Sequence, residues 1–264
     1  MLRMLLTRLR QGHRTIVFPP TEPALPERYR GRPVLDAGSC SAMAPPCGAE
    51  RTAGALHHDP TRPPFVDLGK ALFCPEEAAA CPRGALRFST DYAMATRTRE
   101  ALRSDTGEVA LATALEDRSR RLFGRSLRLR SVAAGSCNGC EAELVALGNV
   151  VFDLARFGVQ FVASPRHADG LVVTGAVSQN MRLALEKTYA AIAEPKLVIA
   201  VGSCAISGGP FRGSPEVLDG VPPEIPVDLY IPGCPPHPLT IIDGLLRLLG
   251  RLGSRGAGPP RPTR

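Results

Sequence analysis

The chain contains no tryptophan and few other aromatic residues, with 4 Tyr and 9 Phe among 264 residues. Proteins that bind single-stranded nucleic acid stack the bases on aromatic side chains, so this shortage argues against nucleic acid as a partner. The formal net charge is nevertheless +7, and the whole excess falls within residues 1–130. We therefore expect the basic first half to meet an acidic protein or an anionic membrane surface.

Long apolar runs are also lacking. No uncharged apolar stretch approaches the about 18 residues that a membrane-spanning helix needs. The apolar start MLRMLLTRLR is interrupted by arginines and has no small-residue cleavage site. The sequence thus predicts a soluble protein that stays in the cytoplasm. Residues 1–20 predict a basic amphipathic helix that ends at Pro19 and Pro20 and either packs on the protein or rests on a partner or a membrane interface.

The sequence changes character near residue 126. Residues 21–96 are rich in Pro, Gly and Ala and show little helical periodicity, and residues 97–125 predict a charged, helical connector. From residue 126 onward, the apolar runs SLRLRSVAAG, VQFVAS, GLVVTG, KLVIAVG and DLYIPG predict strands. The stretches EAELVALGNVVFDLARFG, SQNMRLALEKTYAAIA and HPLTIIDGLLRLLGRLG predict helices between and after them. This alternation predicts an α/β fold with an open, doubly wound parallel sheet over residues 126–252 and a disordered basic tail at 253–264.

Eight cysteines are present, and four of them follow predicted strands. Because nothing in the sequence indicates secretion, metal or cluster chemistry is favoured over disulfides. The carboxyl ends of parallel strands line a single crevice, so we expect these four thiols to meet there as ligands of a soft metal site. They are Cys137 and Cys140 in GSCNGCEAEL, Cys204 in VGSCAISGG and Cys234 in IPGCPPHP.

The residues around these cysteines suit such a site. Gly139 and Gly202 allow tight turns in which backbone amides face the sulfurs, and Pro235 biases Cys234 toward an extended backbone. Glu141 and Glu143 follow the first pair at a helix start, where the dipole stabilises them or where they handle protons at an interface. We expect His237 to be exposed. Two alternatives stay open: single buried thiols, and structural zinc, although zinc usually pairs two close Cys-x-x-Cys knuckles.

The motifs GSCNGCEAEL, VTGAVSQNM, VGSCAISGG and IPGCPPHP resemble the small iron–sulfur subunit of membrane-associated nickel–iron hydrogenases of the formate hydrogenlyase type. That subunit is homologous to the 20 kDa subunit of respiratory complex I, and the resemblance covers about residues 120–252. It implies a flavodoxin-like fold and one four-iron four-sulfur (4Fe-4S) cluster held by Cys137, Cys140, Cys204 and Cys234. It also implies single-electron transfer to a catalytic large subunit, within a complex at the inner face of the cell membrane.

The spacing of the first two cysteines differs between the hydrogenase subunit and the complex I subunit. Adjacent cysteines are typical of complex I, whereas Asn138 and Gly139 stand between Cys137 and Cys140 as on the hydrogenase side. The resemblance implies no complete active site on this chain alone. A complex I-type NADH–quinone oxidoreductase subunit, with a quinone site at the partner interface, remains an alternative. A cluster-free or zinc-binding assembly scaffold is the other.

Residues 66–89 resemble the second motif of a two-cluster ferredoxin, Cys-x2-Cys-x2-Cys-x3-Cys-Pro. Aligning Cys81 with the last place and Cys74 with the second leaves Ala71 and Glu77 at the other ligand places. Cys40 and Cys47 repeat the same spacing, so each cluster would keep about two thiolates. We therefore expect residues 21–96 to form a small α+β, ferredoxin-like domain that has lost its clusters and serves docking. A single cluster or zinc site built from these four cysteines, disulfides, or free thiols are the alternatives.

Overall fold

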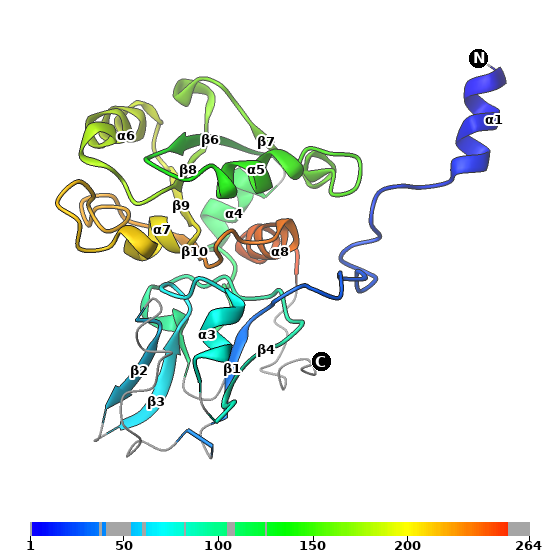
Figure 1. Cartoon of the computed structure of the whole chain (residues 1–264). Helices are drawn as coiled ribbons and strands as arrows, with labels where there is room; N and C mark the ends of the chain where they lie inside the picture. Colours follow the sequence, from blue (N-terminus) through cyan, green and yellow to red (C-terminus); the bar gives the residue numbers. More distant parts are fainter. Residues whose placement is uncertain are drawn as a thin grey trace.

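The computed structural model describes residues 2–36, 39–40, 54–59, 62–81, 83–104, 109–124 and 126–252. Cys47 and the predicted tail at 253–264 lie outside the described residues. Figure 1 shows a parallel sheet with its helices on one side of the molecule and a smaller group of antiparallel strands on the other, with α8 between them.

The second half folds around a five-stranded sheet in the order β10-β9-β8-β6-β7, and every neighbouring pair is parallel. The strands are β6 (Leu127–Ala133), β7 (Val159–Phe161), β8 (Gly170–Thr174), β9 (Leu197–Val201) and β10 (Leu229–Ile231). The first strand lies between the second and the third, which is the flavodoxin-like order. β8 and β9 are buried along their whole length, as their unbroken apolar runs require. The predicted fold class is confirmed.

Helices cover both faces of this sheet. They are α5 (Gly139–Ala146), α6 (Gln179–Ala191), α7 (Ser203–Ser207) and α8 (Pro238–Leu248), with 3-10 turns η2 (Leu154–Phe157), η3 (Pro165–His167) and η4 (Gly209–Phe211). Val173 and Val198 pack in one core cluster with Leu185 of α6. Ile199 packs in another cluster with the apolar residues of α8. Alternate residues of the central strands therefore point to opposite layers.

The predicted helix over residues 141–158 is wrong beyond Ala146. The Asn149 side chain accepts hydrogen bonds from the amides of Val151 (2.8 Å) and Phe152 (3.0 Å). Asparagine competes with helical hydrogen bonding in this way, and the chain turns before the short η2.

The first half contains small antiparallel sheets. β1 (Pro33–Leu35) pairs with β4 (Leu86–Phe88), and β3 (Arg62–Asp67) pairs with both β2 (Leu56–Asp59) and β5 (Arg103–Ser104). The short helix α3 (Pro75–Ala79) precedes β4, and η1 (Glu100–Leu102) precedes β5. These elements agree with a small α+β unit, while the resemblance to a ferredoxin stays a prediction.

The amino-terminal helix α1 spans Leu2–Gln11. A helix reaching Pro19 is therefore not formed: Gly12, at φ +62°, adopts the left-handed conformation that commonly ends helices. No residue of α1 is buried, and its leucines are exposed. In Figure 1 this helix stands apart from the rest of the protein.

The predicted helical connector at residues 97–125 is helical only in part: its described residues contain the 3-10 turn η1 and the α-helix α4 (Asp117–Phe123). Residues 109–116 are irregular, and Ala112 and Leu115 are buried in the same core cluster as α8. The amide of Leu115 donates to the carbonyl of Leu248 (2.9 Å), at the end of α8. This segment is part of the core because its apolar residues pack on α8.

All eleven residues of α8 are buried. One side faces the sheet, and the other meets the first half, where a Cβ on Gly244 would lie 2.7 Å from the Cβ of Ala95. Thr96 pairs with Tyr230 of β10 through amide-to-carbonyl hydrogen bonds of 3.0 and 2.9 Å. The two halves therefore share one hydrophobic core and one sheet edge.

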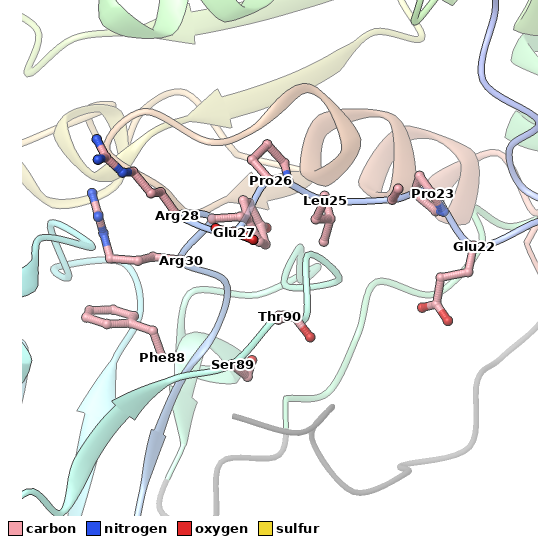
Figure 2. A pocket seen from close by; sticks show the side chains of 12 residues that line it. Glu22, Pro23, Leu25, Pro26, Glu27, Arg28, Arg30, Phe88, Ser89 and Thr90 are labelled. Atoms are coloured by element: carbon pink, nitrogen blue, oxygen red, sulfur yellow. The ribbon is translucent and has the colours of Figure 1, made fainter. Parts of the chain in front are cut away.

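An extended segment, residues 22–30, runs beside α8 and meets the end of β4. Together with Phe88, Ser89 and Thr90 it lines an open pocket of about 700 Å³ (Figure 2). The side chains of Arg28 and Arg30 project from this segment to the same side (Figure 2). Arg30 Nε donates to the carbonyl of Phe73 (2.7 Å), which ties the segment to the loop before α3.

Substitutions in the buried ion pair of α8 test how this helix is packed between the two halves. Arg247 Nε lies 2.7 Å from Asp243 Oδ2, and the two side chains are 3% and 2% exposed. We expect Arg247→Met to lower the free energy of unfolding by about 3–5 kcal/mol, because it removes the cation paired with the buried carboxylate of Asp243. The double replacement Asp243→Leu/Arg247→Met should cost clearly less than the sum of the two single changes. Urea unfolding measures both, and a single change costing under about 1 kcal/mol would contradict this account.

Candidate metal centre

The four cysteines of the second half lie where strands of the parallel sheet end. Cys137 and Cys140 follow β6, with Cys140 in the first turn of α5. Cys204 lies in α7, directly after β9, and Cys234 lies between β10 and α8. Electrostatic interactions connect Cys140 with all three of the others, so the four thiols are close to one another. The structure brings together the residues that the strand-end rule predicts.

Glycines occupy three positions where the backbone comes close to the cysteine sulfurs. A Cβ on Gly202, at φ +89°, would lie only 2.5 Å from Cys140 Sγ, and one on Gly209 would lie 2.8 Å from Cys204 Sγ. A Cβ on Gly139 would lie 3.6 Å from Cys137 Sγ and 3.7 Å from the Cβ of Pro235. The turn holding Cys137 therefore contacts the turn holding Cys234, and Cys140 contacts the end of β9.

A further glycine lets the turn after β6 cross the end of β8. Gly175, at φ +84°, would place a Cβ 2.7 Å from the amide nitrogen of Ser136 and 2.7 Å from the carbonyl carbon of Gly135. Since β8 lies between β6 and β9 in the sheet, this close backbone approach is what allows Cys140 to reach Gly202.

Ser203 joins three loops at the site. Its hydroxyl donates to the carbonyl of Ala71 (2.6 Å) and lies 3.2 Å from the carbonyl oxygen of Gly233, to which its amide donates (2.9 Å). This residue therefore links the helix of Cys204, the turn of Cys234 and a loop of the first half. Sequence reasoning missed it, since its only signal is a serine beside Cys204 at a helix start.

Burial and mutual repulsion make free thiolates costly here. Burial raises the pKa of Cys140, and Glu141 and the other three thiols raise it further. Burial, then Cys234 and Cys137, raise the pKa of Cys204 to about 11. Burial and Cys137 also raise the pKa of Cys234. Metal cations remove this cost, because coordinated thiols lose their protons.

The donor set fits a 4Fe-4S cluster. Four thiols are the ligands that such clusters use. Among the residues with described positions, no three Cys, His, Asp or Glu side chains lie close enough to hold a single metal ion. In a four-iron cluster each thiolate binds a different iron, so the sulfurs need not converge on one point.

The two glutamates after Cys140 have different surroundings. Glu141 Oε1 accepts a hydrogen bond from the hydroxyl of Thr174 at the end of β8, while its Oε2 is buried without a hydrogen-bond partner in the described part of the chain. Glu143 lines a cavity of about 220 Å³ together with Cys234. Burial raises the pKa of Glu143.

His237 is half-buried, so the expectation that it is exposed is wrong. It caps α8: Nδ1 accepts a hydrogen bond from the amide of Leu239 (3.2 Å). Its ring meets Tyr29 and Phe152 edge-on, with centroids 5.3 and 5.9 Å apart. Burial lowers its pKa. Aromatic contacts from distant segments explain why the sequence did not show this.

The cysteines of the first half are arranged differently. Cys40 and Cys81 are buried in one hydrophobic cluster, and Cys74 is half-buried just before α3. Cys74 and Glu77 both act electrostatically on Cys234, so this loop lies beside the four-cysteine site. Whether the first-half cysteines bind anything stays a matter of prediction.

Exposure differs strongly among the four site cysteines. Cys140 and Cys204 are each 9% exposed and Cys234 is half-buried, whereas Cys137 is exposed. The site is thus most buried at Cys140 and Cys204 and most exposed at Cys137.

The fold and the site define an α/β protein with a flavodoxin-like sheet and four cysteines gathered at its carboxyl edge. The family described as the NADH ubiquinone oxidoreductase 20 kDa subunit matches residues 137–248, from Cys137 to the end of α8. The chain belongs to this family, whose members include oxidoreductase subunits.

Three relatives illustrate its breadth. An NADH-quinone oxidoreductase subunit of Phocaeicola vulgatus is 48% identical over 48% of this chain and 64% of its own length. The "probable membrane-bound hydrogenase subunit mbhJ" of Pyrococcus furiosus is 41% identical over 53% of this chain and 85% of its own length. Formate hydrogenlyase subunit 7 of Escherichia coli K12 is 42% identical over 51% and 54%. This chain therefore spans less than two thirds of the first of these relatives.

Thiol reactivity of the metal-free, reduced protein tests the site geometry. Among the four site cysteines, we expect iodoacetamide to modify exposed Cys137 first. Raising the thiol pKa from 9.0 to about 11 lowers the thiolate fraction at pH 8 about a hundredfold, so Cys204 should react far more slowly and speed up as the pH rises. Peptide mass spectrometry measures the order, and equal rates at Cys137 and Cys204 would contradict it.

Proposed function

We propose that this chain is the electron-transfer subunit of a multi-subunit oxidoreductase, and that Cys137, Cys140, Cys204 and Cys234 hold one 4Fe-4S cluster. The observation that carries the proposal is the convergence of four thiols at the carboxyl edge of the sheet, with glycine wherever a Cβ would meet a sulfur. Membership in a family of oxidoreductase subunits supports it.

The bound cluster supplies single-electron exchange. The chain's own residues fix its position and exclude water from its buried side, at Cys140 and Cys204. Gly202 and Gly209 let the backbone close on two sulfurs, and Ser203 locks the turns of Cys204 and Cys234 together. Burial of Cys140 and Cys204 gives the low-dielectric surroundings that, with hydrogen bonding, set a cluster's potential. No group on this chain is assigned to substrate chemistry.

The exposed side at Cys137 is the face we assign to the catalytic large subunit. The Cys-x-x-Cys spacing, with Asn138 and Gly139 between the ligands, favours a partner of the nickel–iron hydrogenase or formate hydrogenlyase type. Relatives with hydrogenase and formate hydrogenlyase names support this choice. In the described ranges, every helix is too short or too polar to cross a bilayer. We propose attachment to the inner face of the cell membrane through partner subunits.

A second candidate is a complex I-type subunit with a quinone site at the interface with its 49 kDa-like partner. A mostly apolar cavity of about 620 Å³ lies along α5, the helix of Cys140, and is lined by Leu144, Val145 and Phe161. The 48% identity to an NADH-quinone oxidoreductase subunit also favours it. Quinone-dependent oxidation of the reduced cluster in the assembled complex would support this candidate over the hydrogenase type.

Anaerobic purification tests the cluster directly. We expect about four irons and four sulfides per chain and an electron paramagnetic resonance (EPR) signal on reduction. Cys204→Ser should abolish most of the signal, whereas Cys81→Ser, in the first half, should leave it. A colourless protein that contains zinc would instead identify a scaffold, and loss of iron only in Cys81→Ser would move the cluster to the first half.

A matched pair of glycine replacements tests the geometry. Gly202 and Gly213 both have positive φ, +89° and +80°, but only a Cβ on Gly202 meets a sulfur; one on Gly213 has nothing within 4 Å. We expect Gly202→Ala to lose most of its bound iron and Gly213→Ala to keep it, because only the new Cβ at Gly202 would clash with a cysteine sulfur. Equal iron content in the two variants would show that the contact with Cys140 does not matter.

A further inference from the structure

The helix α1 presents an apolar face that no other described part of the chain covers. None of its residues is buried. At about 100° per residue its four leucines share one stripe along the helix. Each of them is at least 46% exposed; they are Leu2, Leu5, Leu6 and Leu9. Leucines that are gathered on one face and left exposed indicate a contact surface and not a solvated face.

The other side of α1 carries only positive charge. Arg3 and Arg10 lie beyond one border of the leucine stripe, and Arg8 lies beyond the other. Arg14 follows soon after the helix, and no aspartate or glutamate occurs before Glu22. A leucine stripe with arginines on both sides complements an anionic lipid surface, because the leucines enter the acyl boundary while the arginines reach the headgroups.

Hydrogen bonds fix the chain just after α1 to the second half of the protein. Thr15 Oγ1 donates to the carbonyl of Val150 (2.8 Å), and the amide of Ile16 donates to the carbonyl of Val151 (2.9 Å). Arg156 Nη1 donates to the carbonyl of Ile16 (2.8 Å). The helix is therefore held within a few residues of a fixed point on the loop that follows α5.

This fixed point has exposed apolar side chains of its own. Val150, Val151 and Val17 are all exposed. The hydrogen bonds of Thr15 and Ile16 join the two segments that carry these valines. The valines therefore lie near one another, close to the end of α1, and extend the apolar contact surface from the helix to the folded body.

We propose that α1 binds directly to an anionic lipid surface and lies flat on it, with its leucines in the acyl boundary and its arginines at the headgroups. Val17 and Val150 contact the same surface beside it. This inference goes beyond the proposed function, in which partner subunits supply the attachment, and it needs no bound cluster. Helices shorter than about 12 residues are marginal in water without tertiary contacts, so lipid binding also stabilises α1.

Co-sedimentation of the full chain with lipid vesicles tests the leucine stripe. We expect binding to vesicles of phosphatidylcholine and phosphatidylglycerol in equal parts, and at least tenfold weaker binding by Leu5→Ser/Leu9→Ser. The control Leu122→Ser/Leu183→Ser removes two leucines that are also exposed, on α4 and α6, and should bind like the wild type. Wild-type protein that stays in the supernatant, or equal binding by the two double variants, overturns the proposal.

A second pair of variants tests the charge. Each arginine near an anionic leaflet strengthens binding about fivefold, so Arg8→Gln/Arg10→Gln should bind the same vesicles about 25-fold more weakly at low ionic strength. Arg121→Gln/Arg166→Gln removes two exposed arginines elsewhere and should change binding less than twofold. An equal loss in both variants would show that net charge alone attracts the protein, and it would overturn the role of α1.

Hydrogen exchange locates the contact and separates a membrane from a second copy of the chain. We expect the anionic vesicles to slow amide exchange within α1 and to leave α6 unchanged. Protection of α1 that rises with protein concentration in the absence of vesicles would identify self-association and overturn lipid binding. The metal-free protein should give the same result, so a failure of the cluster assignment and a failure of this proposal are distinguishable.

Discussion

The site depends on contacts between bare backbone and sulfur. Cys140 reaches the end of β9 because Gly202 has no side chain, and the turn after β6 crosses β8 because Gly175 has none. Both glycines have a positive φ, and a Cβ at either one would clash with neighbouring atoms. The backbone conformation and the lack of space therefore each require glycine at these two positions. The carboxyl ends of parallel strands always lie at the same edge of a sheet. Here the glycines at that edge also let the loops after three strands come within reach of one cofactor.

The remaining walls of the site come from the first half. Ser203 binds the Ala71 carbonyl, and Phe73 and Tyr29 line the cavity beside Cys234. These contacts hold because α8 is packed between the two halves and places Cys234 at its amino-terminal end. The first half therefore contributes to the environment of the four cysteines whether or not it binds a cofactor.

Much of the fold and the placing of the four cysteines follow from the sequence. The runs GLVVTG and KLVIAVG are buried strands because they are apolar on both faces, and the strand-end rule then brings Cys137, Cys140, Cys204 and Cys234 together.

The ends of helices and the contacts between distant segments were not predictable in the same way. Asn149 turns the chain just beyond α5 through its own side chain, and Gly12 ends α1, although the sequence predicts a longer helix in both places. The role of Ser203 rests on hydrogen bonds to backbone atoms of other loops, which residue type alone does not reveal. The segment at 109–116 is packed rather than solvated because α8 offers an apolar face that periodicity alone does not reveal.

The complete burial of α8 makes the two halves one cooperative unit. This helix cannot separate from either half without exposing its leucines and isoleucines to water. Tyr92, Ala95 and Leu115 pack in the same core cluster as α8, so a loss of packing at any of them weakens both halves at once. The two halves should therefore unfold in a single transition and not one after the other.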